Sequence, residues 1–324
     1  MNLIAALADK IGPRPAGSPA AADAAVAIAD SMRELGLEPR FQEFEFMGYE
    51  PLEPELHVAG ERWEAGPCMY AGVTPPGGVE GTVARVGEFV IRAGEFETQI
   101  FAIEDAGGAE LARLYVNARG PAIPMPALYP PNLGGPATWI SAGDGERLAA
   151  LVGAPARLLS GGELRPGLRD RNVIAEVAGA SPEAVVVCAH YDSVWRGPGA
   201  IDNATGVEGV RRLIERFTAA PQKRSLIFCA FAAEELGLLG ATHYVQDAKL
   251  RGDLDRIAGV VNLDCIAHGR LFEVMTGPEE MEARAAGFIE ELGLRARYDI
   301  HVGPPLPGSD HLPFWQEGIP ATAI

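Results

Sequence analysis

The second half of the chain alternates between two hydrophobic patterns. Short, mostly apolar runs predict buried strands, and the segments between them carry apolar residues three or four positions apart, the spacing along one face of a helix. The predicted elements are strands 172–177 and 185–189, helix 203–217, strand 225–230, helix 236–247, strands 259–264 and 271–275, helix 278–292 and strand 319–323. Strands that alternate with helices are typical of an α/β domain, here with a mixed, mostly parallel sheet sandwiched by helices.

The first residues of the chain add two helices and one strand to this domain. The helices flank the Pro- and Gly-rich turn 12–19, and the second of them, 20–35, ends before Gly36, as a C′ glycine commonly ends a helix. Residues 40–46 alternate polar and apolar side chains with period two, which predicts a strand.

The pattern changes in the middle of the chain, where short β-like runs alternate with turns rich in Gly and Pro. We therefore predict that residues 48–166 form a small β-rich domain inserted into a larger domain, which comprises residues 1–47 and 167–324. A length of 324 residues agrees with about two domains.

Composition narrows the range of partners. The chain has 27 basic and 44 acidic residues, a net charge of −17, which is a poor match to nucleic acid or to an anionic membrane. The N-terminus lacks the pattern of a signal peptide, and no apolar run is long enough to span a bilayer. We expect a cytoplasmic protein with no nucleic-acid and no membrane partner, and the sequence does not indicate an oligomeric state.

The four cysteines, Cys68, Cys188, Cys229 and Cys265, have no C-x-x-C spacing. Three of them lie on predicted core strands, which predicts buried, reduced thiols and fits the cytoplasm. Cys265 directly follows an aspartate, which places it near a candidate site without making it a ligand.

Two adjacent carboxylates, Glu234 and Glu235, follow the predicted strand 225–230. In open parallel sheets, ligands bind in the crevice beyond the carboxyl ends of the strands, and this makes the pair a candidate site. Taken alone, the pair is equally consistent with favourable negative charge at a helix N-terminus, worth roughly 0.3–1 kcal/mol.

Three further segments favour a site over that alternative. His190 and Asp192 follow another strand, and residues two apart in an extended chain point the same way. A carboxylate commonly orients an imidazole that ligates a metal. Asp202 lies in a loop that runs into a helix, and Asp264 closes a third strand. We therefore predict that one crevice collects these side chains.

The sequence contains no G-x-x-x-x-G-K-[ST] phosphate loop, no G-x-S-x-G nucleophile elbow and no H-E-x-x-H zinc motif. Instead, five segments together resemble the successive motifs of metallopeptidase family 28, the co-catalytic zinc exopeptidases that include bacterial leucyl aminopeptidases and glutamate carboxypeptidase II. These segments are AHYDS at 189–193, AIDNATGV at 200–207, FAAEELGLLGA at 231–241, NLD at 262–264 and PGSDHLPFWQEGIPA at 307–321. The segment IGPRPAGS at 11–18 is similar to the N-terminal segment of that family, and the middle region resembles the protease-associated insert of some members.

The resemblance implies the zinc exopeptidase, phosphorylase/hydrolase-like fold and a set of metal ligands. Asp202 would bridge two zinc ions, His190 and Asp264 would complete one metal shell, and Glu235 would belong to the other. Nitrogen and oxygen ligands suit Zn²⁺, and Co²⁺ or Mn²⁺ can occupy such a site as well.

The resemblance also implies the catalytic residues. Glu234 matches the general base, and Asp192 matches the carboxylate behind His190. Two metals that share a carboxylate can polarise the scissile carbonyl and supply a nucleophilic water. A glutamate that points into the substrate space can then take the proton of that water and pass it to the leaving amine.

The chain departs from the family in one respect. The fifth ligand of the family is a histidine after the last strand, and the printed sequence ends at Ile324, inside that strand. We expect that ligand beyond Ile324, in a longer natural chain. His311 belongs to the SDH segment, so we interpret it as a residue of the site wall, and recruitment of His311 as a ligand is the alternative.

The resulting prediction is a metal-dependent exopeptidase acting on peptides, with aminopeptidase activity favoured. An aminopeptidase needs acids that hold the substrate ammonium, and Asp310 is a further candidate for this role. A carboxypeptidase, which also stays possible, needs arginines that clamp a carboxylate, and Arg196 is the only basic residue beside the motifs. Two more functions stay open, a glutaminyl-cyclase-like acyltransferase with one zinc and a peptidase-like binding module without turnover.

Overall fold

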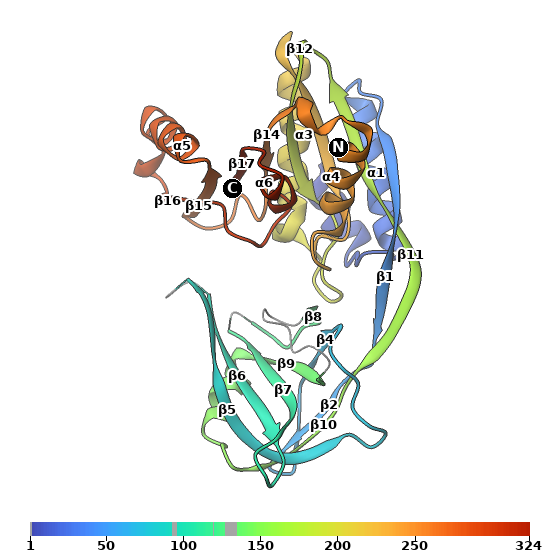
Figure 1. Ribbon diagram of the computed structural model, residues 1–324, viewed down its shortest axis with the longest axis vertical. Helices are drawn as coiled ribbons and strands as arrows, with labels where there is room; N and C mark the ends of the chain where they lie inside the picture. Colours follow the sequence, from blue (N-terminus) through green and yellow to red (C-terminus); the bar gives the residue numbers. More distant parts are fainter. Residues whose placement is uncertain (1, 93–95, 119, 127–134) are drawn as a thin grey trace. The chain divides into compact units, whose positions relative to one another are not determined.

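The computed structural model describes residues 2–92, 96–118, 120–126 and 135–324 (Figure 1). The chain divides into two compact units, one of Met1–Phe46 with Arg169–Ile324 and the other of Met47–Leu168. Two sheets, of eight and nine strands, contain all the strands of the described residues. In the described part of the chain, none of the helices has the length and apolar character that crossing a membrane requires.

The eight-stranded sheet and its helices are built from the two ends of the chain. In chain order the elements are η1 (Ala5–Ile11), α1 (Pro19–Glu34), β1 (Arg40–Pro51), β11 (Gly162–Val177), β12 (Gly179–His190), η2 (Ala200–Ala204), α3 (Thr205–Thr218), β13 (Gln222–Phe231), α4 (Leu239–Arg251), η3 (Leu254–Arg256), β14 (Ile257–Asn262), β15 (Leu271–Gly277), α5 (Glu279–Glu291), η4 (Leu294–Ala296), β16 (Asp299–Gly303), α6 (Leu312–Gln316) and β17 (Ala321–Ala323).

The order of strands in this sheet is β1-β11-β13-β12-β14-β17-β15-β16. The central strands β13, β12, β14 and β17 are parallel to one another, whereas β11 is antiparallel to β13 and β15 is antiparallel to β17. The prediction of a mixed, mostly parallel sheet is confirmed. Because the four central strands run the same way, their carboxyl ends meet at one edge of the sheet.

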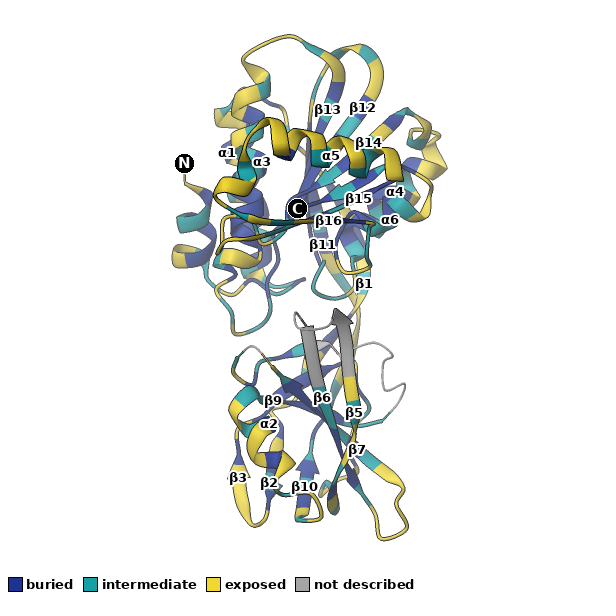
Figure 2. Cartoon of the chain, turned by 90° about the vertical axis from the view of Figure 1, so that its left-hand side faces the viewer, coloured by how far each residue is buried: buried dark blue, intermediate teal, exposed yellow. Residues whose placement is uncertain are grey.

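The central strands are apolar on both faces. In β12, Val187 and Ala189 pack into one buried cluster together with residues of α1 and α3. Val186 and Cys188, which point the other way, pack into a second cluster with residues of α4 and α6. Helices therefore cover both faces, and much of β12 and β13 is buried (Figure 2). Burial on both faces explains why these strands are continuous apolar runs in the sequence.

One predicted element begins later than expected. The helix predicted from residue 236 begins at Leu239, because residues 232–238 form a turn in which Ala233 and Leu238 have φ of 56° and 61°. The amide of Gly240 donates to the carbonyl of Ala232 and closes this turn. Glu234 and Glu235 thus lie before α4, so the alternative that they only supply negative charge at a helix N-terminus is wrong.

The middle of the chain forms the second, β-rich unit. Its elements are β2 (Glu55–Val58), β3 (Glu61–Trp63), β4 (Gly66–Met69), β5 (Val79–Arg92), β6 (Phe96–Glu104), β7 (Glu110–Asn117), β8 (Met125–Pro126), β9 (Ala137–Ser141), α2 (Ala142–Ala149) and β10 (Pro155–Leu159), with the strand order β3-β2-β10-β5-β6-β7-β9-β4-β8. Its core contains Phe101, Leu114 and Trp139, each completely buried. Ser141 caps α2 by accepting a hydrogen bond from the amide of Asp144.

All four cysteines are free thiols. Cys68, Cys188 and Cys229 are buried on strands, as predicted, whereas Cys265 is exposed. Burial raises the pKa of Cys68 to about 12, so this thiol is protonated at neutral pH.

The core of the first unit gives a prediction for stability. Phe228 on β13 is completely buried, so Phe228→Ala should lower the free energy of unfolding by about 3–5 kcal/mol. The matched control is Phe288→Ala, because Phe288 is 56% exposed and its loss should change stability by no more than about 0.5 kcal/mol. Urea unfolding of both variants measures the difference, and equal losses would contradict this assignment of the core.

Candidate metal centre

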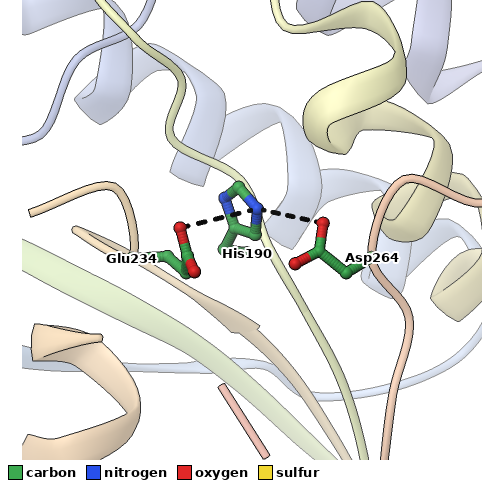
Figure 3. Close-up of side chains that lie close together, drawn as sticks. All are labelled: His190, Glu234 and Asp264. Atoms are coloured by element: carbon green, nitrogen blue, oxygen red, sulfur yellow. Dashed lines mark ion pairs between the residues drawn. The ribbon is translucent and has the colours of Figure 1, made fainter. Parts of the chain in front are cut away.

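His190 lies at the centre of the candidate site (Figure 3). It is the last residue of β12 and is 1% exposed. Its Nε2 atom lies 3.1 Å from Oδ1 of Asp202, 3.5 Å from Oδ1 of Asp264 and 3.9 Å from Oε2 of Glu234. The structure therefore brings together side chains that follow three different strands and the loop before α3.

Asn203 connects the loop of Asp202 to the segment of Asp264. Its Nδ2 donates to the carbonyl of Leu263 at 2.9 Å, and its Oδ1 accepts hydrogen bonds from the amides of Gly206 and Cys265. Gly206 is required here, because a Cβ at this position would lie 2.3 Å from the carbonyl oxygen of Leu263. This close packing fixes one metal-ligand candidate relative to the other.

Asp264 follows β14 and is held from behind. Its Oδ2 accepts a hydrogen bond of 2.6 Å from the hydroxyl of Ser309, and that hydroxyl accepts one from the side-chain amide of Asn262. Burial raises the pKa of Asp264, but His190 and Ser309 lower it to about 2 overall. Asp264 is therefore ionised at neutral pH, as a metal ligand must be.

Asp192 links His190 to the turn of the two glutamates. Its side chain is completely buried, and its Oδ1 lies 3.5 Å from Nδ1 of His190. The same carboxylate accepts hydrogen bonds from the amides of Glu234, at 3.1 Å, and Glu235, at 3.2 Å. The carboxylate predicted behind the imidazole thus also orients the turn that presents the glutamates.

The two glutamates have different neighbours. Burial raises the pKa of Glu234 well above its usual range, and burial together with Asp202 raises the pKa of Glu235 to about 8. Candidate ligand atoms of His190, Glu234 and Asp264 all lie within 4.8 Å of one another. Glu235 is not part of this group, so the division of roles between the two glutamates stays a prediction.

Cys265 belongs to a second group of candidate ligand atoms. Its sulfur and carboxylate oxygens of Asp202 and Asp264 all lie within 4.8 Å of one another. The sequence indicated that Cys265 lies near the site. It did not indicate that the thiol lies close to both aspartates. Cys265 has a positive φ of 54°.

Asp310 and His311 lie beneath the surface, each completely buried. Neither carboxylate oxygen of Asp310 has a hydrogen-bond partner within the described residues. Burial raises the pKa of Asp310 to about 8 and lowers the pKa of His311. Their predicted roles in the site wall or in substrate binding stay predictions.

The donor set fits a divalent metal ion. Burial lowers the pKa of His190, but Glu234, Asp264 and the other carboxylates around it raise this pKa well above its usual range, so the site favours positive charge. One imidazole nitrogen surrounded by carboxylate oxygens is a ligand set that suits Zn²⁺, Co²⁺ or Mn²⁺. A bound cation would neutralise the excess negative charge of these buried acids.

The sequence did not reveal one basic residue of the site. Arg196 is the only basic residue beside the motifs, but the structure also brings Arg14 close to Asp192, Asp202 and Glu235. Burial lowers the pKa of Arg14 to about 10, and these three carboxylates partly offset the decrease. All the hydrogen bonds described for the Arg14 guanidinium end on backbone carbonyl oxygens. Arg14 is therefore not available to clamp a substrate carboxylate.

A mixed, mostly parallel α/β sheet that collects a histidine and several carboxylates at its strand ends is the architecture of an α/β metallopeptidase. Residues 172–324 match the model of Peptidase family M28. The matched residues, 172–324, belong to this peptidase family.

Curated relatives agree with this assignment. The chain is 29% identical over 350 residues to Aminopeptidase YwaD of Bacillus subtilis, a match that covers 98% of this chain and 73% of the relative. It is 31% identical over 206 residues to Leucine aminopeptidase 2 of Trichophyton equinum, which covers 58% of this chain but only 40% of that relative.

Solved structures show the same fold. The chain matches BSAP, a zinc aminopeptidase from Bacillus subtilis, with a TM-score of 0.69 and 26% identity, over 99% of this chain and 82% of that one. A glutaminyl cyclase from an Acidobacteriales bacterium shares the fold alone, with a TM-score of 0.53 and 16% identity, over 100% of this chain and 76% of that one. The fold by itself therefore does not separate these two activities.

Proposed function

We propose that this chain is a zinc-dependent aminopeptidase that removes N-terminal residues from peptides, with Glu234 as the general base. The observation that carries the proposal is the buried His190, whose Nε2 faces Asp202, Glu234 and Asp264 within 3.9 Å. The names of the relatives, which include aminopeptidases and a zinc aminopeptidase, support the same activity.

Four side chains would hold the metal. We assign His190, Asp202, Glu235 and Asp264 to two zinc ions, with Asp202 shared between them. When bound, zinc polarises the scissile carbonyl and makes water a stronger acid.

The chemistry of the chain itself rests on Glu234. Its carboxylate is 11% exposed, and burial raises its pKa, which makes it a stronger base than a solvated glutamate. In the proposed reaction, Glu234 takes a proton from the attacking water and donates it to the amine that leaves. Asp192 keeps Glu234 in place by accepting the hydrogen bond of its backbone amide.

The charges around the site favour a substrate amine over a substrate carboxylate. The described site residues are mainly acidic, and an ammonium group is stabilised beside carboxylates. The buried Arg14 does not clamp a substrate carboxylate, because all the hydrogen bonds described for its guanidinium end on backbone carbonyls.

A metal count combined with a peptide panel tests the proposal. The purified full chain should contain two zinc ions, lose activity on treatment with a chelator and regain it when zinc is added back. It should release the first residue of peptides with a free N-terminus and leave N-acetylated peptides intact.

Three results would contradict the proposal. One ion per chain, with cyclisation of peptides that begin with glutamine, would support a glutaminyl cyclase. Absence of bound metal would support a binding module. Release of the last residue, with no effect of N-acetylation, would indicate a carboxypeptidase.

A further inference from the structure

Arg14 is one of the largest completely buried side chains of the protein. It lies in the Pro- and Gly-rich segment between η1 and α1, far in sequence from the metal-ligand candidates. A buried arginine is expected to have a charged partner or many hydrogen bonds, because removing its charge from water is costly.

The guanidinium binds carbonyl oxygens from both sides of one loop. It donates from Nε to Tyr191, from Nη1 to Pro198 at 2.7 Å, Gly12 at 3.2 Å and Leu7 at 3.4 Å, and from Nη2 to Gly199 at 2.7 Å. Tyr191 directly follows His190, and Gly199 precedes Asp202 by three residues. Arg14 therefore joins the beginning and the end of the loop that connects these two metal-ligand candidates.

The backbone of Arg14 adds to this connection. Its amide donates to the hydroxyl of Ser193 at 3.1 Å, and its carbonyl accepts from the amide of Ser193 at 3.3 Å. The carbonyl of Gly199 accepts both from Nη2 of Arg14 and from the amide of Ala204, at 3.0 Å. This shared acceptor connects Arg14 to the turn that contains Asp202.

Gly199 fits closely against the guanidinium. Its φ is 60°, and a Cβ at this position would lie 2.6 Å from Nη2 of Arg14 and 2.6 Å from Cβ of Ser193. The same Cβ would lie 2.8 Å from the carbonyl oxygen of Asp202, so a larger residue at position 199 would crowd the guanidinium and both ends of the loop.

We propose that Arg14 is a positioning residue of the metal centre, which fixes the loop between His190 and Asp202 and thereby sets the position of Asp202 against His190. The inference rests on the proposed metal-dependent function, but the fixing of the loop can be measured without metal. Lysine cannot replace Arg14, because a single ammonium group does not reach carbonyls on both sides of the loop as the planar fork of arginine does.

The test compares Arg14→Lys with the unsubstituted full chain and with Ile28→Ala. Ile28 is a buried residue of α1 in the same core, so Ile28→Ala lowers stability without touching the loop. Three quantities are measured: hydrogen exchange of the backbone amides of residues 199–206 in metal-free protein, the Kd for zinc from competition with a chelator, and the urea midpoint of unfolding.

Arg14→Lys should speed exchange of the Ala204 amide by at least about 10-fold, because the guanidinium hydrogen bonds to its acceptor Gly199 and to the adjacent Pro198 are lost. It should raise the Kd for zinc by about 10–100-fold, the usual effect of losing a residue that orients metal ligands. Ile28→Ala should lower the urea midpoint and leave the zinc Kd within about 2-fold, because a distant core residue does not orient a ligand.

Gly199→Ala provides a second route if Arg14→Lys fails to fold. Because the added methyl group crowds the guanidinium, Ser193 and the carbonyl of Asp202 while Arg14 is retained, this variant should show the same faster exchange and weaker zinc binding. The proposal is overturned if the Arg14 and Gly199 variants bind zinc as the unsubstituted protein does, or if Ile28→Ala weakens zinc binding equally.

The inference and the proposed function can fail separately. An unsubstituted protein that binds no zinc would refute the proposed function and the metal part of this inference. Faster exchange in Arg14→Lys would still support the fixing of the loop, and unchanged exchange would refute it.

Discussion

Glu234→Gln should lower kcat by about 10²–10⁴-fold, or about 3–5 kcal/mol of transition-state stabilisation, while the metal content stays unchanged. Glutamine has nearly the same shape as glutamate but cannot accept the proton of the attacking water. Substrate affinity should be retained, because the site is otherwise intact. Steady-state kinetics and elemental analysis on the same preparation measure the two quantities.

Glu235→Gln is the matched control, because it makes the same change at the adjacent residue. Glu235 is assigned to a metal, so its replacement should lower metal content and reduce activity through lost occupancy. The comparison of the two variants tests this assignment directly, because proximity alone would make Glu234 the ligand. Candidate ligand atoms of Glu234, His190 and Asp264 lie within 4.8 Å of one another, and Glu235 is not part of this group. If Glu234→Gln sheds metal and Glu235→Gln retains it, the two roles are the reverse of those we assign.

Asp202→Asn should weaken zinc binding at both metal positions by at least about 100-fold, because a shared carboxylate ligates each ion. Replacing a residue that only orients a ligand already lowers metal affinity by about 10–100-fold. Asp202 Oδ1 lies 3.1 Å from Nε2 of His190, and Asp202 is, after burial, the largest cause of the raised pKa of Glu235, so Asp202 is near the assigned ligands of both ions. Zinc titration followed by elemental analysis measures the loss.

The control for Asp202→Asn is Asp23→Asn, an equal change of charge at an exposed position of α1. This variant should bind zinc as the unsubstituted protein does. Retention of two ions at native affinity in Asp202→Asn would rule out the shared ligand, and loss of one ion alone would assign Asp202 to a single metal.

Hydrophobic periodicity predicted the helices and central strands of the first unit because each central strand is buried on both faces. The start of α4 could not be predicted in the same way. Positive φ values at Ala233 and Leu238 are unusual for residues other than glycine, and tertiary contacts stabilise them. One such contact is Asp192, which binds the amides of Glu234 and Glu235. Two short elements, β16 and α6, were also missed. Each has only five residues, which is too few to show a hydrophobic period.

The site could be predicted as far as it follows the ends of parallel strands. His190 ends one central strand, and Asp264 and the two glutamates lie within four residues of the ends of two others, so topology alone brings them to one edge. The role of Arg14 was missed because its guanidinium binds backbone carbonyls. Every residue type has a backbone carbonyl, so these partners cannot be recognised in the sequence. Its partner Tyr191 is 177 residues away in sequence.

The long sequence separation between Arg14 and its partners determines when the N-terminal segment can fold during synthesis. At typical rates of synthesis of about 5–20 residues per second, Arg14 leaves the ribosome roughly 10–35 s before Tyr191. During this interval the guanidinium has only Leu7 and Gly12 among its final acceptors, so its charge stays in water. The N-terminal segment therefore docks only after β12 and the loop that follows it have been synthesised. A nascent chain that stops before this point can form neither the hydrogen bonds that bury Arg14 nor the metal centre.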